Sequence, residues 1–309
     1  MKEALERWDH FWFEPIPVHI YALLRIVLGI VGCLTLIGLA DLPTLWHLDG
    51  FVPIGTSGLG IKAFLVSHGL GNIAGTMLYV CTLLAFVSMT IGLLSGLSVA
   101  LALITSLIQV SWNYLPLSGA DAALKAMLFC LIWADCGSVW SADAWIASRG
   151  RGHSALDSTY PIAPLRLFRF QVALIYLNAG LWKLLNPYWR DGTAVHYVLE
   201  SNMYRRFPFE LPVSVDTLVT ALTYGTLFWE LAFVPLVLFR RTRPVALAAG
   251  VLIHLGMLLT IEIGPFHVVM LASYLAFLNP RIVPTLPKRL WDRKRDKSFA
   301  DADIRAVRS

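Results

Sequence analysis

The sequence has few charged residues for its length. Only 15% of its 309 residues are Asp, Glu, Lys or Arg, whereas about 25% is usual in a soluble domain. Hydrophobic residues make up 57% of the chain, so a soluble fold of this size would leave apolar surface that so few charges are unable to cover. This composition excludes a disordered chain and a nucleic-acid-binding protein. It predicts a protein whose main partner is the lipid bilayer.

Cysteines and metal-binding motifs are also scarce. The chain has four cysteines, and all of them fall within apolar stretches: Cys33, Cys81, Cys130 and Cys136. Their spacing fits neither a disulfide scaffold nor a zinc or haem motif. The eight histidines form no H-x-x-H or H-E-x-x-H pair, so the sequence predicts no metal cofactor.

Long apolar stretches are what the sequence does contain. A helix needs roughly 20 mostly apolar residues to cross a bilayer. We predict eight such helices, at residues 18–40, 72–94, 95–115, 120–139, 163–185, 216–239, 244–262 and 264–280. The chain is therefore expected to be an all-α, polytopic integral membrane helix bundle in the inner (plasma) membrane of the cell.

The basic residues predict the orientation of this bundle. Residues 240–243 contain three arginines, and residues 281–309 are strongly basic. Because Lys and Arg concentrate on the cytoplasmic side of membrane proteins, both termini are expected to be cytoplasmic. Residues 1–17 are expected to form an interfacial helix, residues 18–280 the membrane domain, and residues 281–309 a basic cytoplasmic tail.

Charged groups inside apolar stretches need a partner, a water-filled cavity or a function. Towards the cytoplasmic side of the predicted bundle lie Arg25, Asp135 and Glu230. Their charges are complementary. We therefore expect Arg25 to form a structural ion pair with either Glu230 or Asp135 that holds helices together.

A second group of polar residues lies towards the predicted outer side. We expect a pocket that opens outward and is lined by Asp121, Lys125, Trp189, Asp191, Glu262 and His267. Trp189 and Asp191 belong to a segment of mixed aromatic and charged residues that would cover the pocket as a lid. Residues that only meet water at the membrane surface would give the same pattern, so both interpretations stay open.

Lys183 ends the fifth apolar stretch, between Trp182 and Trp189. Either it extends to the membrane surface beside these aromatic rings, or burial favours its neutral amine and makes it a general base. His254 is likewise either a hydrogen-bonded residue of the core or a catalytic group.

Several segments resemble one known family. Leu177–Gly192, with the sequence LNAGLWKLLNPYWRDG, resembles the signature of the HTTM (horizontally transferred transmembrane) domain family. The YALLR sequence of Tyr21–Arg25, the segment Ser111–Asn113 and the segment from His254 to Met270 match in the same order. The family includes the vitamin K-dependent γ-glutamyl carboxylases.

In carboxylases of this kind, a lysine at the place of Lys183 is held to deprotonate reduced vitamin K. The resemblance therefore implies a carboxylase-like activity with Lys183 as the quinol base and Asn113 and His254 as further catalytic residues. It also implies a reduced quinone, of the vitamin K or menaquinol type, as the cofactor. Tyr114 and Trp182 stand where those carboxylases have a histidine and a further lysine.

A second branch is similar in size and layout, namely the multi-pass membrane component of bacterial sporulation-delaying toxin systems. This likeness implies that the partner is a secreted peptide or small protein. Together the resemblances predict a membrane protein that modifies or matures a secreted peptide on the extracytoplasmic side. The alternative is a non-catalytic membrane scaffold, export protein or immunity partner of such a peptide.

Overall fold

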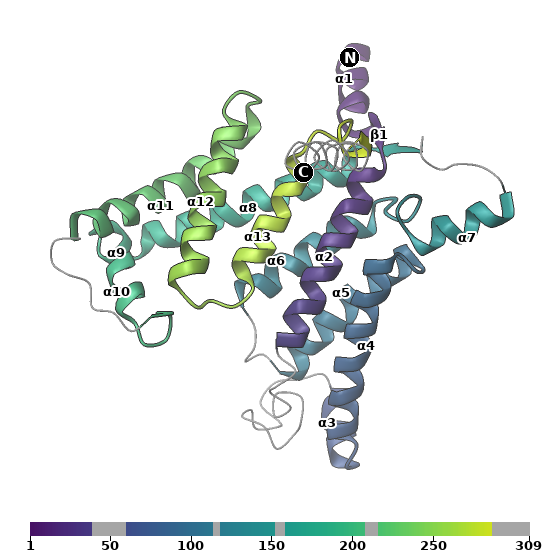
Figure 1. The fold of residues 1–309 in the computed structure, drawn as a ribbon, viewed down its shortest axis with the longest axis horizontal. Helices are drawn as coiled ribbons and strands as arrows, with labels where there is room; N and C mark the ends of the chain where they lie inside the picture. The colour runs from purple at the N-terminus through teal and green to yellow at the C-terminus, as the bar shows by residue number, and fades with distance from the viewer. Residues whose placement is uncertain (39–59, 114–117, 152–157, 208–215, 286–309) are drawn as a thin grey trace, which may run out of the picture.

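The computed structural model describes residues 1–38, 60–113, 118–151, 158–207 and 216–285. Within these ranges the fold is helical apart from one small two-stranded sheet (Figure 1). Tyr114 and most of the predicted basic tail, residues 286–309, lie outside the described residues.

Helices occupy all eight places where the sequence predicts a membrane span. Their bounds are α2 His19–Gly38, α4 Gly71–Ile91, α5 Ser95–Trp112, α6 Gly119–Ile132, α8 Ala163–Leu185, α11 Asp216–Leu238, α12 Arg243–Thr260 and α13 Phe266–Ser273. Among the described residues five of them, α2, α4, α5, α11 and α12, are long and apolar enough to cross a membrane. The chain is thus a multi-pass membrane protein, and passage of α6, α8 and α13 through the bilayer stays a prediction.

Two of these helices are shorter than predicted. α6 has 14 residues and stops at Ile132, although the predicted span continues to Val139. In the segment that follows, the carbonyl groups of Cys136 and Trp140 accept hydrogen bonds from Arg25. α13 has eight residues and passes into a 3-10 turn, η4 Tyr274–Phe277.

Shorter elements connect the long helices. They are α1 Lys2–Phe13, α3 Gly60–Ser67, α7 Ala142–Arg151, α9 Pro187–Arg190, α10 Ala194–Glu200 and η5 Val283–Thr285. β1 Pro15–Pro17 pairs antiparallel with β2 Thr159–Pro161, with Ile16 opposite Tyr160. This sheet departs from the predicted all-α fold. Each strand has only three residues, which is too short for an alternating sequence pattern to mark it.

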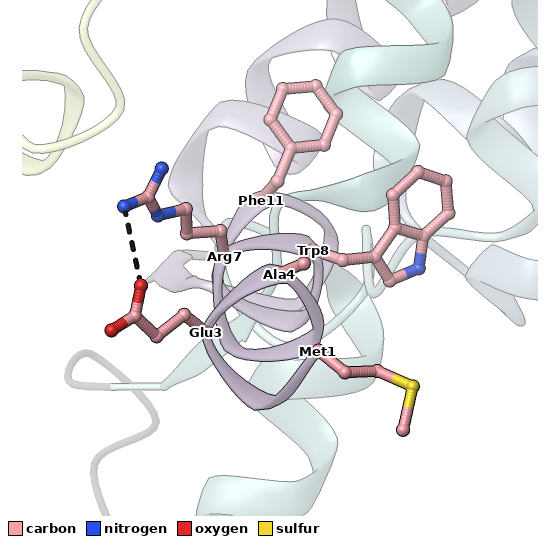
Figure 2. A pocket seen from close by; sticks show the side chains of 6 residues that line it. All are labelled: Met1, Glu3, Ala4, Arg7, Trp8 and Phe11. Atoms are coloured by element: carbon pink, nitrogen blue, oxygen red, sulfur yellow. Dashed lines mark ion pairs between the residues drawn. The ribbon is translucent and has the colours of Figure 1, made fainter.

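The helix predicted at the N terminus is present as α1, which stands away from the bundle at the top of Figure 1. Figure 2 shows its surface, where Arg7 forms an i,i+4 ion pair with Glu3 at 4.0 Å and Trp8 projects from the opposite side. The Trp8 side chain is 59% exposed. One contact to the bundle is made by Arg166 of α8, whose guanidinium lies 3.7 Å from the ring centroid of Phe11. Contact of α1 with a lipid surface stays a prediction.

The long helices pack in two groups. α4 packs against both α2 and α5, and α11 packs against both α8 and α12 to form the second group (Figure 1). α6 joins the groups because it contacts α2, α5 and α8, and α13 contacts α6, α2 and α12. One cluster of buried apolar side chains, which includes Leu28, Met127, Phe168 and Phe233, runs through both groups.

The side chain of Arg25 is completely buried near the start of α2. Its Nε donates to the carbonyl of Cys136 (2.8 Å) and its Nη2 to the carbonyl of Trp140 (2.6 Å). Its Nη1 donates to the carbonyls of Met89 (2.5 Å) and Thr90 (2.9 Å), which belong to the last turn of α4. The guanidinium therefore binds carbonyls in the last turn of a helix, where the helix dipole is negative.

The predicted ion pair of Arg25 with Asp135 or Glu230 is wrong. Asp135 accepts a hydrogen bond from the Ser138 hydroxyl (2.5 Å), and Glu230 pairs with a lysine of α8. Backbone carbonyls take the place that the prediction gave to a carboxylate. The prediction fails because a sequence shows where charges lie along the chain, but not which helix ends surround them.

Asp143, in α7, holds the start of α5. Its carboxylate accepts hydrogen bonds from the N–H of Leu94 (2.8 Å), the N–H of Ser95 (2.7 Å) and the Ser95 hydroxyl (2.8 Å). Burial acts to raise the pKa of the Asp143 carboxyl, but these hydrogen bonds outweigh it and hold the pKa below its usual value. A carboxyl with a lowered pKa contributes stability above the pKa of the unfolded chain, and this stability is lost as the pH falls through the folded-state pKa.

We therefore expect Asp143→Asn to lower the free energy of unfolding by about 1 kcal/mol at neutral pH, the usual cost of losing a helix cap. The variant should also lose less stability than the wild type when the pH falls below about 4, near the ordinary pKa of Asp. Thermal unfolding of the detergent-solubilised protein at a series of pH values measures both effects. Asp9→Asn, on the exposed helix α1, is the matched control. An Asp143→Asn variant that melts with the wild type at neutral pH would contradict this role.

Candidate functional site

One ion pair joins α8 to α11 inside the bundle. Nζ of Lys183 lies 2.5 Å from Oε1 and 2.7 Å from Oε2 of Glu230. The Glu230 side chain is 10% exposed and the Lys183 side chain 25% exposed. Gly180, one turn before Lys183, lets the helices approach, because a Cβ there would meet the side chain of Leu231 at 2.9 Å. The ring centroid of Trp189 lies 5.0 Å from Nζ of Lys183, a cation–π distance.

The two charges meet because the chain folds back after α8. The Tyr224 hydroxyl donates to the carbonyl of Arg190 (2.9 Å), and the N–H of Val195 donates to the Thr223 hydroxyl (3.2 Å). These bonds attach α9 and α10 to the first half of α11, so the end of α8 is level with the middle of α11. The sequence analysis offers Glu230 as a partner for Arg25, whereas the structure pairs it with Lys183.

A chain of hydroxyl and imidazole groups lies beside this ion pair. The Tyr176 hydroxyl oxygen is 2.6 Å from Nε2 of His254 and 2.6 Å from the Tyr274 hydroxyl oxygen. All three side chains are buried. The rings of Trp229 and Phe233 pack against the Tyr176 ring, with centroids 4.8 Å and 4.2 Å away. Hydrogen bonds therefore tie α8, α12 and η4 together next to α11.

His267 of α13 is the neighbour of His254, and their ring centroids are 5.9 Å apart. The His267 side chain is fully buried. Among the described residues neither of its ring nitrogens has a hydrogen-bond partner, and the same holds for Nδ1 of His254. In the same part of the chain, no three His, Cys, Asp or Glu side chains are grouped as a metal site. We call the set of Lys183, Glu230, Tyr176, His254, Tyr274 and His267 the polar centre.

An open pocket of about 920 Å³ lies at the end of the bundle opposite the N terminus, where α2 ends and α6 and α13 begin. Asp121 and Glu262, two of the residues expected in a pocket, line it together with Tyr204 and Phe266. Oε2 of Glu262 lies 2.8 Å from Nη2 of Arg206. We call this cavity the distal pocket.

The structure places the remaining expected residues as follows. Trp189 and His267 lie at the polar centre and not in the lining of the distal pocket. Lys125 is one turn after Asp121 on α6 and does not line that pocket. The carboxylate of Asp191 caps an exposed turn by accepting from the N–H and the hydroxyl of Thr193 (3.0 and 2.6 Å). Asn113 ends α5, which packs chiefly against α4 and α6.

The sequence analysis misses Tyr176 and Tyr274, because a tyrosine within an apolar helix resembles an ordinary core residue. One signal is present for Tyr176, which precedes Lys183 by seven residues. Seven residues are about two helical turns, so both side chains lie on one face of α8. No comparable spacing marks Tyr274.

Comparison with known protein families matches residues 13–281 to the HTTM domain. Among curated proteins, the chain is similar to the sporulation-delaying protein SdpB of Bacillus subtilis (strain 168), with 26% identity over 141 residues. This match covers 44% of the chain and 44% of that relative, so the chain spans less than half the length of the curated protein that it matches. No solved structure matches the chain. The family match includes every helix that contributes to the polar centre and the distal pocket.

Proposed function

The chain belongs to the HTTM domain family, and from this premise we propose that it modifies or matures a secreted peptide, with Lys183 and Glu230 at the reacting centre. The observation that carries the proposal is the ion pair inside the bundle in which Nζ of Lys183 contacts both carboxylate oxygens of Glu230. It lies beside the hydrogen bond between Tyr176 and His254. Similarity to a sporulation-delaying protein supports a peptide as the partner. The extracytoplasmic side is where such a peptide would meet the distal pocket.

A buried ion pair can supply the base that this chemistry needs. In a site of low dielectric constant, two separated charges lose the solvation that water would give them. A proton can then move from the Lys183 ammonium to the Glu230 carboxylate, which leaves a neutral amine and a neutral acid. The neutral amine of Lys183 is the base, and Glu230 is the group that stores its proton.

A reduced quinone fits the residues around Lys183, and we include it in the proposal as the cofactor. The ion pair offers an acceptor for a hydroxyl proton, and the ring of Trp189 offers a flat surface beside Nζ of Lys183. Trp182 and Leu185, next to Lys183 on α8, are 68% and 70% exposed, so this helix end faces the lipid from which an apolar quinone would come. When bound, the quinone would supply reducing equivalents for the reaction.

We expect Lys183→Ala to abolish the modification of the peptide while the protein is still inserted in the membrane. A short secreted peptide encoded beside the gene, co-expressed with the wild type or the variant, is analysed by mass spectrometry for a mass gain or a new cleavage. Lys62→Ala is the matched control, because Lys62 of α3 donates to the carbonyl of Trp112 and lies outside the polar centre. An unchanged peptide product with Lys183→Ala would remove the enzymatic proposal.

A second function, a non-catalytic scaffold for the same peptide, is favoured by the backbone beside the distal pocket. The N–H of Glu262 donates to the carbonyl of Tyr204 (2.6 Å), and the N–H of Arg206 donates to the carbonyl of Thr260 (3.2 Å). These bonds flank an isolated antiparallel bridge between Arg205 and Ile261, and backbone paired in this way can receive a peptide as a further strand. The scaffold hypothesis expects Lys183→Arg and Lys183→Gln to keep full function, whereas substitutions in the segment from Trp189 to Glu210 should abolish peptide binding. Residues 208–210 of that segment lie outside the described residues.

A further inference from the structure

The two histidines of the polar centre are unusual for groups inside an apolar bundle. Together they present three ring nitrogens without a hydrogen-bond partner among the described residues, namely Nδ1 of His254 and both nitrogens of His267. Their side chains are only 2% and 0% exposed. Because more than nine in ten buried polar groups are partnered, such nitrogens indicate a place where a small hydrogen-bonding molecule binds.

We propose that His254 and His267 form a proton relay, completed by one water molecule bound between their rings, that connects Tyr176 to the distal pocket. The relay extends the proposed function, since it gives the proton held by Lys183 and Glu230 a path out of the bundle.

The spacing of the rings suits a single water molecule. A water molecule that bonds two nitrogens holds them up to about 5.6 Å apart, because each hydrogen bond is about 2.8 Å long. The ring centroids are 5.9 Å apart, so nitrogens on the facing sides of the rings fall within that reach. A buried water molecule usually makes about three hydrogen bonds, and Nδ1 of His254 and one ring nitrogen of His267 are free to make two of them.

Imidazole and phenol groups can pass a proton without keeping a charge. A neutral imidazole holds a proton on one nitrogen and a lone pair on the other, so it accepts at one side and releases at the other. In the relay, the O–H bond of Tyr176 breaks as its proton binds Nε2 of His254, and the tyrosine oxygen takes up the next proton. Nδ1 of His254 then gives its proton to the water molecule, which gives one of its own to His267. Each step breaks one bond to hydrogen and forms one, and no electron is transferred.

The inner end of the relay lies at the ion pair. Tyr176 is two helical turns before Lys183 on the same face of α8. Its ring also packs against Trp229, the neighbour of Glu230 in the chain, with centroids 4.8 Å apart. The charge of Glu230 acts on Tyr176 and the charge of Lys183 acts on His254. The charges of the ion pair therefore act on the first members of the relay from about two helical turns away along α8.

The outer end of the relay lies at the distal pocket. Phe266, which precedes His267 in the chain, lines that pocket. The charges of Arg206 and Glu262 both act on His267. The Glu262 side chain is 60% exposed, so a carboxylate whose charge acts on His267 is in contact with water. The ring of Phe266, with its centroid 5.9 Å from that of His254, closes the space between the two histidines on one side.

The test is the exchange of imidazole N–H protons with solvent, measured by NMR on the full chain with ¹⁵N-labelled histidine in lipid nanodiscs. Signals that vanish in His254→Gln and in His267→Gln assign the two residues, and exposed His10 on α1 is the internal reference. We expect the imidazole proton of His254 to exchange with D₂O in the wild type, and to exchange about tenfold more slowly in His267→Phe, because exchange of a buried group depends on the path to solvent.

Two results would overturn the relay. A His254 proton that persists for hours in D₂O in the wild type would show that no water reaches the site. Equal exchange of His254 in the wild type and in His267→Phe would show that its protons leave by another path. If His267→Phe does not fold, His267→Gln replaces it, since an amide binds water but does not pass a proton on, and the same slowing is expected. Peptide products play no part in this measurement, so the relay and the proposed function can fail separately.

Discussion

Arg25→Met is expected to lower the free energy of unfolding by about 4 kcal/mol, because four carbonyl groups around a buried guanidinium lose their donor at once. Two of these carbonyls end α4 and two follow α6, so the substitution releases both segments from the start of α2. A loss of this size lowers the melting temperature by roughly 6 °C in a chain of this length. Thermal unfolding of the detergent-solubilised protein, followed by size-exclusion chromatography, measures the effect.

Two further substitutions separate the hydrogen bonds of Arg25 from its charge. Arg25→Lys keeps the charge but has one compact ammonium in place of the planar fork, so it reaches fewer carbonyls and should fall between methionine and arginine. Arg149→Met is the matched control, because Arg149 is exposed on α7 and stacks 3.7 Å from the ring centroid of Trp145. An Arg25→Met variant as stable as Arg149→Met would contradict the structural role of the buried guanidinium.

Lys183→Met is expected to destabilise the bundle by about 3 to 5 kcal/mol, since it leaves the carboxylate of Glu230 buried without a partner. Glu230→Gln should cost less. The Lys183 side chain is 25% exposed and long enough to reach the membrane surface when unpaired, whereas the Glu230 side chain is 10% exposed and shorter. We therefore expect Lys183→Met to be less stable than Glu230→Gln.

Combining Lys183→Met with Glu230→Gln should recover most of the lost stability, because no unpaired charge remains. Thermal unfolding of the four proteins gives the coupling energy of the pair. The combined variant should still leave the peptide partner unmodified if Lys183 is the base. A combined variant that is as unstable as Lys183→Met would show that the ion pair is not the source of the effect.

Hydropathy predicts most of the architecture, and it fails where contacts between residues far apart in the chain decide the local structure. Helices lie at all eight apolar stretches, and five of them are long and apolar enough to cross a membrane, which demands about 20 apolar residues whatever the tertiary fold. α6 is the clearest failure, because the residues from Trp133 to Val139 lie outside the helix and Arg25 binds the carbonyl of Cys136 in this segment. The strands β1 and β2 also escape detection, as their pairing joins residues far apart in the chain.

The candidate site is also predictable only in part. Lys183, Glu230, His254 and His267 are all recognisable in the sequence as polar groups within apolar helices, because such groups are costly there. The sequence does not show which of these groups pair. The pairing depends on where α9 and α10, which are bonded to α11, place the end of α8. Tyr176 and Tyr274 become visible only when their hydroxyl groups are seen to meet at 2.6 Å.

The partners of Arg25 have a consequence for biogenesis. Met89 follows Arg25 by 64 residues, and Trp140 follows Arg25 by 115 residues. The arginine is therefore synthesised long before the carbonyls that accept its hydrogen bonds. An arginine in the hydrocarbon costs about 3 kcal/mol or less when it is close to an interface. During synthesis α2 must therefore keep its charged end in the headgroups or against the insertion machinery. It moves to its final depth once α4, the second long apolar helix, and the segment after α6 have been synthesised.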